Sequence, residues 1–265
     1  MGIILALVAF ALCAIVYVRM VKREIPEPIS KKQAIIPVAA GLAAPILATI
    51  LIIIYGFIMK FTVGVPLAAL SDSLLYKSLV TSFVGAGFTE EFVKFLLLLL
   101  LVKVLRPKNV YEYVLICVGI SVGFTLLEEV TYGGGGGAIT ALTRIPAFGM
   151  HLVFALLMGS HLGIARYNKQ NGLGGVGMHC FLGLFLPMLW HTVFDASTVD
   201  NTALMVENEA TNVTGFIIAA GVMLVSVVMQ FVMFAWLKKK TGEYSGMALN
   251  WQEDQLPVNV LGQEI

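Results

Sequence analysis

Apolar residues dominate seven stretches of this chain, and each stretch is about as long as a helix that crosses a lipid bilayer. A bilayer core about 30 Å thick needs roughly 20 apolar residues in helical form. The stretches cover residues 2–19, 34–59, 78–105, 111–132, 145–165, 177–195 and 214–237. This pattern predicts an all-α polytopic membrane helical bundle with about seven transmembrane helices.

The positive charges predict how this bundle is oriented. The first stretch has no basic residues before it and no small-residue cleavage site, and basic residues follow it from Arg19 onward, so we expect an anchoring helix rather than a removed signal peptide. Of the 17 Lys and Arg residues, an outside N-terminus places Lys60, Lys77 and Arg144 outside and Lys94 within a stretch, which leaves 13 in cytoplasmic loops. Because cytoplasmic loops are enriched in positive charge, we predict a multi-pass protein of the plasma membrane with its N-terminus outside and its C-terminus cytoplasmic.

The connections between the stretches are mostly short, which predicts one transmembrane helical domain over residues 1–240 with a catalytic core at about 78–195. Residues 241–265 form a polar stretch without periodicity and are predicted to be a cytoplasmic tail. Segment 60–77 is apolar but is interrupted by Gly64 and Pro66, so it is interpreted as a re-entrant or interfacial piece.

Composition narrows the class of protein. Charged residues make up 12% and hydrophobic residues 58% of the chain, with a mean hydropathy of +0.90. A soluble domain carries roughly 25% charged residues, so an ordinary soluble fold is excluded. The 17 basic and 16 acidic residues nearly balance, which argues against nucleic acid as a partner. The three cysteines lie in apolar stretches, which excludes a disulfide scaffold and a cysteine-based zinc knuckle.

Ionisable residues within the predicted spans are the candidates for function, since such groups are costly in a membrane. The predicted topology places one set in the outer half of the bundle, contributed by four spans: Glu90, Glu91, Glu128, Glu129, His151, His191 and Asp195. His161 and His179 fall at the cytoplasmic ends of their spans and are expected to stay apart from this set. Glu129 is the member expected to be idle.

Helical spacing pairs several of these residues. Residues four positions apart share a helix face, which pairs Glu90 with Lys94 and His191 with Asp195. The first pair can keep the carboxylate ionised, and the second can orient the histidine ring. Each pair also has a purely structural interpretation, as a buried ion pair or as a cap at the membrane interface. The sequence leaves open whether Glu90 or Glu91 is the general base, and Glu90 is preferred because it shares its face with Lys94.

A stripe of small residues follows His151 along the same helix face: Ala155, Gly159 and Gly163. Small residues let neighbouring helix backbones approach closely. We expect this stripe to hold His151 against a partner helix.

Carboxylates and imidazoles without a buried nucleophile suit the activation of a water molecule. One glutamate would act as general base toward water and return the proton to a leaving amine. Histidines would donate to the developing oxyanion or bind a zinc ion. The metalloprotease motif H-E-x-x-H is absent from the sequence, so a metal site would have to be assembled between helices.

Four short motifs in order resemble the PrsW family of intramembrane proteases, within the wider group of CAAX prenyl endopeptidases and CPBP proteins. The motifs are EEFVK (90–94), GFTLLEE (123–129), RIPAFGMHLVFALLMG (144–159) and HTVFD (191–195). The sequence departs from the family pattern at two places. Glu129 stands where the family usually has Asn, and the third motif contains an extra Phe-Gly. These departures bear on the identity of the substrate and on the detailed geometry of the site more than on the class of reaction.

The resemblance implies an endopeptidase that cuts membrane-spanning protein substrates, with an anti-sigma factor cut at site 1 as an example, by a glutamic or a zinc-assisted metalloprotease mechanism. It places Glu90 and Glu91 at the catalytic water and Asp195 in support of His191. Glu128, His151 and His191 become catalytic partners or metal ligands.

Two other classes of function stay open. Glutamates and histidines within spans also build a proton- or cation-coupled transporter or channel. A proton relay should cross the whole membrane, whereas the expected set occupies one side, which favours the protease. An inactive scaffold protein is the third alternative, and the complete motif set argues against it.

Overall fold

A computed structural model describes residues 2–24, 29–135, 147–200 and 213–251. Every element within these residues is a helix. In chain order they are α1 (Gly2–Val21), α2 (Lys31–Gly41), α3 (Ala44–Thr62), the 3-10 helix η1 (Leu67–Leu70), α4 (Leu74–Ser82), the π-helix η2 (Phe83–Gly87), α5 (Phe88–Leu105), α6 (Val110–Gly135), α8 (Met150–Gln170), α9 (Val176–Asp195), the π-helix η4 (Ala196–Asp200) and α11 (Val213–Gly246).

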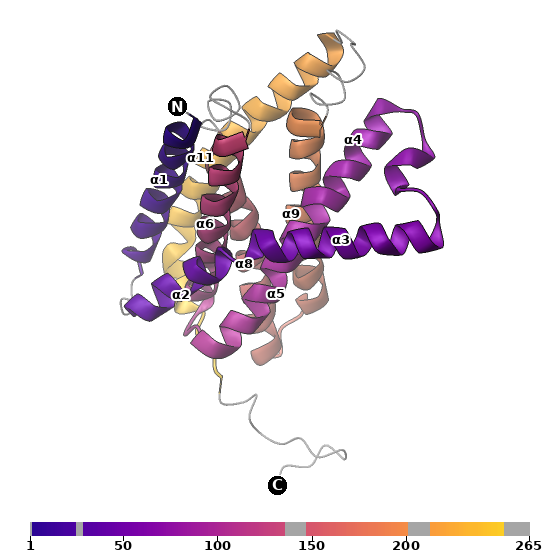
Figure 1. Cartoon of the computed structure of the whole chain (residues 1–265). Helices are drawn as coiled ribbons and strands as arrows, with labels where there is room; N and C mark the ends of the chain where they lie inside the picture. Colours follow the sequence, from indigo (N-terminus) through magenta and orange to yellow (C-terminus); the bar gives the residue numbers. More distant parts are fainter. Residues whose placement is uncertain (1, 25–28, 136–146, 201–212, 252–265) are drawn as a thin grey trace, which may run out of the picture.

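Helix α6 forms the centre of the molecule, with α1, α2, α5, α8 and α11 around it (Figure 1). Of its most apolar 18-residue window, 89% is buried. Glycines allow the closest contact, between α2 and α6. A Cβ atom at Gly41 would lie 2.0 Å from the carbonyl oxygen of Ile120, and one at Gly123 would lie 2.0 Å from that of Val38. The backbones therefore meet directly, as small residues permit in membrane bundles.

A helix or a run of consecutive helices accounts for the described part of each of the seven predicted stretches, and in the fifth stretch the helix α8 begins only at Met150. Among the residues that the structure describes, four helical segments are long and apolar enough to cross a membrane: Lys31–Thr62, Val110–Thr131, Val176–Thr198 and Ile217–Gly246. The helices α5 and α8 are not among them, and both carry polar residues of the candidate site. The protein is thus a multi-pass helical membrane protein, while seven crossings and an outside N-terminus stay predictions.

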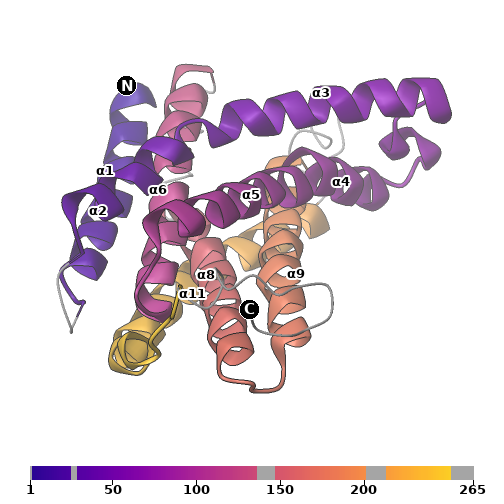
Figure 2. The same ribbon diagram turned by 90° about the horizontal axis from the view of Figure 1, so that it is seen from below.

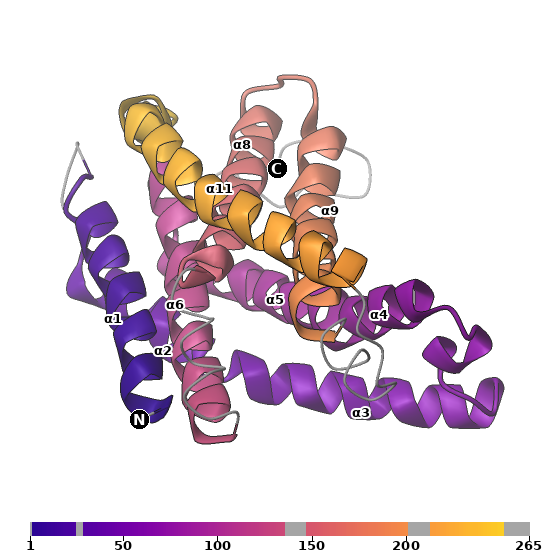
Figure 3. The same cartoon turned by 90° about the horizontal axis from the view of Figure 1, so that it is seen from above.

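The predicted second span is two helices rather than one, because the α2 helix ends at Gly41 and α3 begins at Ala44. Helix α3 runs across the bundle and extends to one side, and α4 leads the chain back toward the bundle (Figures 1 and 2). Segment 60–77 supplies the turn between them, with Gly64 at a φ of +80° and the short η1 helix. The arm formed by α3 and α4 also projects from the bundle in the view from above (Figure 3).

The last helix continues past the predicted boundary at residue 240. Helix α11 ends at Gly246, and Tyr244 and Leu249 are buried in the core. The amide of Leu249 donates to the carbonyl oxygen of Lys108 at 2.8 Å. The polar tail expected from residue 241 therefore starts later than its composition indicated, and residues 252–265 lie outside the described part of the chain.

Candidate active site

The first turn of α5 carries Glu90 and Glu91, and a π-helical turn precedes it. The helices α4, η2 and α5 follow one another without a break from Leu74 to Leu105. Single π turns within a longer helix are frequent at functional sites. A Cβ atom at Gly87, the last residue of η2, would lie 2.0 Å from Oγ1 of Thr192 and 2.7 Å from the carbonyl oxygen of Met188. The glycine therefore allows α5 and α9 to meet beside the two glutamates.

Lys94 lies at the centre of the cluster and is almost fully buried. Its Nζ is 2.8 Å from Oε1 of Glu91, 3.5 Å from Oε2 of Glu90 and 3.2 Å from Nδ1 of His151. The ammonium also lies 3.8 Å from the centre of the Phe124 ring, within the range of a cation–π contact. One cation thus links two carboxylates of α5 to the histidine of α8.

These contacts determine the tautomer of His151. An ammonium group can only donate, so Nδ1 of His151 accepts the hydrogen bond from Lys94. The proton of the neutral ring is then on Nε2, which lies 2.5 Å from Oε2 of Glu128. Glu128 therefore accepts a hydrogen bond from His151 and fixes the orientation of the ring.

His191 faces three carboxylates. Its Nδ1 donates to Oε1 of Glu91 at 2.9 Å, while its Nε2 lies 3.8 Å from Oε2 of Glu90 and 3.6 Å from Oδ2 of Asp195. Its ring stacks on Phe154 with 4.7 Å between the ring centres and 24° between the planes. The stacking and the Nδ1 hydrogen bond hold the ring so that Nε2 points toward Glu90 and Asp195.

The stripe of small residues on α8 packs against α6, as expected. A Cβ atom at Gly159 would lie 3.0 Å from Cα of Val114, and one at Gly163 would lie 3.0 Å from Cγ1 of Val110. This close approach fixes α8 beside α6 and brings His151 within reach of Glu128.

The structure brings together the predicted carboxylates and histidines: Glu90, Glu91, Glu128, His151, His191 and Asp195. Glu128 rather than Glu129 contacts His151. His161 and His179 contact each other instead, with 2.9 Å between their Nδ1 atoms, where the first turn of α9 meets the middle of α8. Arg144, part of the third motif, lies outside the described residues.

Two aromatic residues at the site were not among the predicted site residues, although one of them, Phe124, lies in the second motif and shares a helix face with Glu128. Phe124 lies under the ammonium of Lys94, and Phe154 stacks on His191. The available signal was their position, four residues before Glu128 and three residues after His151, on the same helix faces. An aromatic residue within an apolar span is too common for that spacing alone to select it.

Glu90 and Glu91 differ in exposure. The side chain of Glu90 is 16% exposed, whereas that of Glu91 is 0% exposed. The expected contact between Lys94 and Glu90 is present, at 3.5 Å, but the contact of Lys94 with Glu91 is shorter, at 2.8 Å. Lys94 also contacts His151, so its ammonium is shared among three groups.

The donor set of this cluster fits a metal ion such as zinc. Ligand atoms of Glu90, Glu91, His151 and His191 lie within 4.8 Å of one another. Imidazole nitrogens and carboxylate oxygens are zinc ligands at about 2.0–2.2 Å. In addition, Oε2 of Glu91 is buried without a hydrogen-bond partner among the described residues. This donor set contains His151 and His191 of the predicted metal ligands, while Glu128, the third predicted ligand, contacts His151.

Lys94 competes with a metal ion for these donors. Its ammonium already contacts Glu90, Glu91 and Nδ1 of His151, which are three of the four groups. Nε2 of His151 is engaged with Glu128. Carboxylates that hold a ligand histidine in this way are common partners in metal sites. The ammonium of Lys94 and a metal ion therefore cannot be at these donors together, and metal binding would require the Lys94 side chain to move.

Comparison with known proteins gives related proteases. A family model described as PrsW family intramembrane metalloprotease matches residues 35–237. Protease PrsW of Halalkalibacterium halodurans is 30% identical over 131 residues, which cover 49% of this chain and 59% of that protein. Protease PrsW of Bacillus subtilis is 28% identical over 120 residues, 44% of this chain and 54% of that protein.

Both alignments span less than two thirds of the relative's own length. No solved structure matches the chain. The family model, however, covers most of the chain and includes all four motifs of the cluster. The chain therefore belongs to the PrsW family of intramembrane metalloproteases.

Proposed function

We propose that this protein is an intramembrane endopeptidase that hydrolyses peptide bonds of membrane-associated proteins near the outer membrane face. Family membership supports this reaction class. The observation that carries the proposal is the position of Glu90, a partly exposed carboxylate whose neighbours Glu91, Lys94 and His191 are buried. A general base that activates water must be accessible to the water and must be held in position by its neighbours, and Glu90 meets both conditions.

Glu90 acts as the general base in this proposal. The gap of 3.8 Å between its Oε2 and Nε2 of His191 is too long for a direct hydrogen bond, and a water molecule can bridge polar groups across such a gap. Glu90 takes a proton from the water, and the oxygen attacks the carbonyl carbon of the substrate. Glu90 then gives this proton to the leaving amine as the carbon–nitrogen bond breaks.

The surrounding residues position the base and balance charge. Lys94 and His191 contact Glu91 from two sides and hold this buried carboxylate in place. Glu91 therefore has a structural task, and proton transfer is assigned to Glu90. His191 can carry protons on both ring nitrogens because it faces three carboxylates. Its Nε2–H then donates to the oxyanion that develops on the substrate.

Zinc is part of the proposal as one of two mechanisms, glutamic or metallo. When bound, it would be held by Glu90, Glu91, His151 and His191 and would act as a Lewis acid toward the water and the substrate carbonyl. Lys94 would then move away from Nδ1 of His151. The zinc content of active protein distinguishes the two mechanisms.

The proposed substrate is a membrane-spanning protein in the lipid bilayer of the plasma membrane. The resemblance to the PrsW family adds a specific candidate, an anti-sigma factor cut at site 1. The predicted position of the cluster in the outer half of the bundle agrees with a cut on that side.

The test compares new protein N-termini in membranes that contain wild-type protein, Glu90→Gln or Glu243→Gln. Glu243 is the control, since it is 55% exposed and pairs with Lys240 far along the chain from the cluster. We expect a small set of single-pass proteins to be cut near the outer boundary by wild type and by Glu243→Gln, but not by Glu90→Gln. Identical termini in all three membranes would overturn the proposal and favour proton or cation transport.

A further inference from the structure

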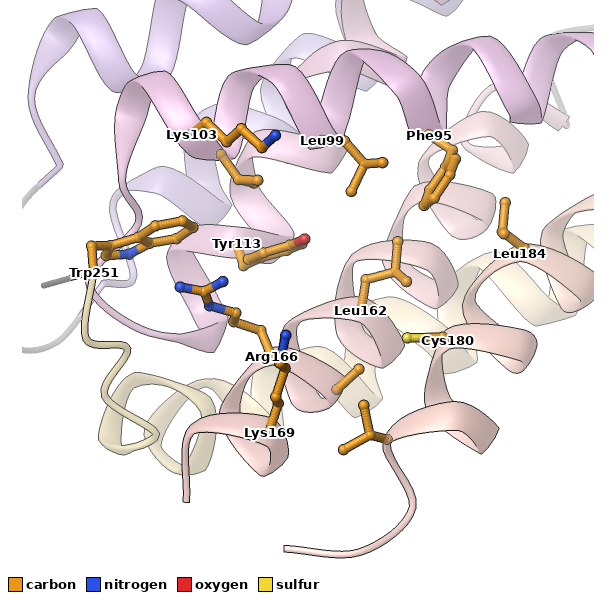
Figure 4. Close-up of a pocket in the computed structure, with 13 residues that line it drawn as sticks. Phe95, Leu99, Lys103, Tyr113, Leu162, Arg166, Lys169, Cys180, Leu184 and Trp251 are labelled. Carbon is orange, nitrogen blue, oxygen red and sulfur yellow. The ribbon is translucent and has the colours of Figure 1, made fainter. Parts of the chain in front are cut away.

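The two ends of helix α8 differ in their surroundings. Toward the end of the helix, Leu162, Arg166 and Lys169 line a cavity of about 340 Å³ between α5, α6, α8 and α9 (Figure 4). Among the residues that the structure describes, this cavity does not reach the first turn of α8. His151 lies in that first turn, as the second residue of the helix. The position of its ring therefore depends on contacts at the start of α8.

The peptide unit between Phe148 and Gly149, directly before α8, is bound on both sides by buried side chains. Its N–H group donates to Oε1 of Gln230 on α11 at 2.7 Å, and its carbonyl oxygen accepts from Sγ of Cys13 on α1 at 2.7 Å. A carbonyl oxygen can only accept, so the thiol is the donor. Two helices from opposite ends of the chain thus hold one peptide unit, two residues before His151.

Gln230 is an inward-facing polar residue on a helix whose surface is mostly exposed. Of the most apolar 18-residue window of α11, 11% is buried, whereas Gln230 itself is 1% exposed. A Cβ atom at Gly149 would lie 2.7 Å from Oε1 of Gln230 and 3.1 Å from Cζ of Phe234. The glycine therefore lets the start of α8 approach α11 closely enough for this hydrogen bond.

The start of α8 depends on these two contacts because its own cap position is a glycine. Gly149 is the N-cap residue, where a Ser, Thr, Asp or Asn side chain usually accepts a hydrogen bond from the first turn. Here the side chains that bind the helix start come from Cys13 and Gln230. Both nitrogens of the His151 ring are engaged with other helices, so a displaced first turn would disturb both contacts.

We propose that Cys13 and Gln230 are positioning residues for His151. They fix the peptide unit before α8 and thereby hold the ring between Lys94 and Glu128. The effect on catalysis rests on the proposed function, whereas the effect on the ring exists without any activity. Polar contacts between membrane helices also stabilise a bundle. The test therefore has to separate the position of the ring from stability.

The test compares substitutions on α11 in the full-length protein in detergent, each measured below its melting temperature. Gln230→Met keeps the size of the side chain and removes the acceptor. Gln230→Glu keeps an oxygen that can accept from the amide in either protonation state. Ser226→Ala is the control, because Ser226 lies one turn earlier on the same helix, is 0% exposed and takes no part in the hydrogen bond to Gly149.

The first measurement follows the ring of His151 by nuclear magnetic resonance. The chain has four histidines, so isotope-labelled histidine gives few ring signals, and His151→Gln identifies those of His151. We expect Ser226→Ala and Gln230→Glu to keep the wild-type signals, with the proton on Nε2. Gln230→Met and Cys13→Ala should shift or double them, while Cys13→Ser, which keeps a donor, should not. Unchanged signals in Gln230→Met and Cys13→Ala would overturn the proposal, even if melting temperatures fall.

The second measurement is hydrolysis of a fluorogenic transmembrane peptide. We expect Gln230→Met to lower kcat about tenfold or more with KM within about twofold of wild type, because small displacements of a group at the reaction centre have effects of this size. Gln230→Glu should restore most of the rate. An equal loss in Ser226→Ala would overturn the proposal. A wild type that cuts no peptide would count against the proposed function alone, and the His151 signals would then decide on the positioning.

Discussion

Glu90 and Glu91 are neighbours in the chain, but their surroundings assign them different tasks. Glu91 is fully buried between Lys94 and His191, whereas the side chain of Glu90 is partly exposed.

We predict that Glu90→Gln lowers peptide hydrolysis about 100-fold or more with little change in thermal stability, because loss of a general base has this effect. A fluorogenic transmembrane peptide assay and a melting curve in detergent measure the two quantities.

Glu91→Gln is the matched comparison, and it should reduce stability as well as activity. Removal of one partner of a buried ion pair costs about 3–5 kcal/mol, because the remaining charge is left without compensation. If Glu91→Gln is as stable as wild type and Glu90→Gln is not, the assignment of the two glutamates is reversed.

The positive charge of Lys94 should weaken the binding of zinc to the cluster. Its ammonium lies among the donors that zinc would use, and like charges at this separation repel strongly. We predict that Lys94→Met binds zinc about tenfold more tightly than wild type. Equilibrium dialysis of the purified protein against zinc buffers measures the affinity. Lys103→Met on the same helix is the control, and equal zinc affinities in all three proteins would show that the cluster is not the zinc site.

At the scale of helices, the contact between η2 and α9 determines how α5 meets His191. A Cβ atom at Gly87 would overlap Thr192, whereas one at Gly85 in the same π turn would meet nothing within 4 Å. We predict that Gly87→Ala costs about 1–3 kcal/mol through overpacking and lowers activity, while Gly85→Ala does neither. Unfolding in detergent and the peptide assay test both variants. If both substitutions had equal effects on stability and activity, the cause would be a change in helix propensity and not the loss of the contact between Gly87 and α9.

The sequence predicts which helices carry the cluster but not how its side chains pair. Spacing pairs Glu90 with Lys94, and that contact exists at 3.5 Å, yet the shorter contacts of Lys94 are with Glu91 and with His151, 57 residues away. A partner so distant depends on how α8 packs, which local spacing does not contain. The π turn at 83–87 is equally hidden, because an extra residue in one turn leaves the apolar pattern nearly unchanged.

The sequence is also a poor guide to the arm formed by α3 and α4. Residues 34–59 have the hydropathy of a single span, and only Gly41 at the end of α2 and Pro45 in the first turn of α3 mark the break between them. The break follows from the contact of Gly41 with α6, which holds α2 while α3 turns away. Gly64 and Pro66, by contrast, correctly indicated the interruption between α3 and α4.

At the scale of the whole molecule, Glu24 links the end of α1 to the start of α6 and should make stability depend on pH. Burial, followed by the nearby Glu112 carboxylate, raises the pKa of Glu24 from 4.5 to about 8. Between these values the folded protein holds a proton that the unfolded chain has lost, so stability falls as the pH rises through this window.

Glu24→Gln should remove this part of the pH dependence, since the amide is neutral throughout. Melting temperatures in detergent at about pH 6 and about pH 9 measure the effect, with Glu243→Gln as the exposed control. Parallel curves for wild type and Glu24→Gln would contradict the prediction.

The orientation of the molecule decides on which side of the membrane the cluster acts. The predicted topology places the turn between α3 and α4 outside and the turn between α8 and α9 inside. Ala69 and Asn171 are exposed in these turns, and Cys13 and Cys117 are buried, so single cysteines can be introduced at either position after Cys180→Ser. We predict that a membrane-impermeant maleimide labels Ala69→Cys but not Asn171→Cys in intact cells.

Lysed cells provide the control, since both cysteines should then react. The predicted result places the carboxylate and histidine cluster toward the outer face, where α4 begins and α9 ends. The opposite result would keep the cluster but place it toward the cytoplasm. Substrates would then be cut at their cytoplasmic boundary.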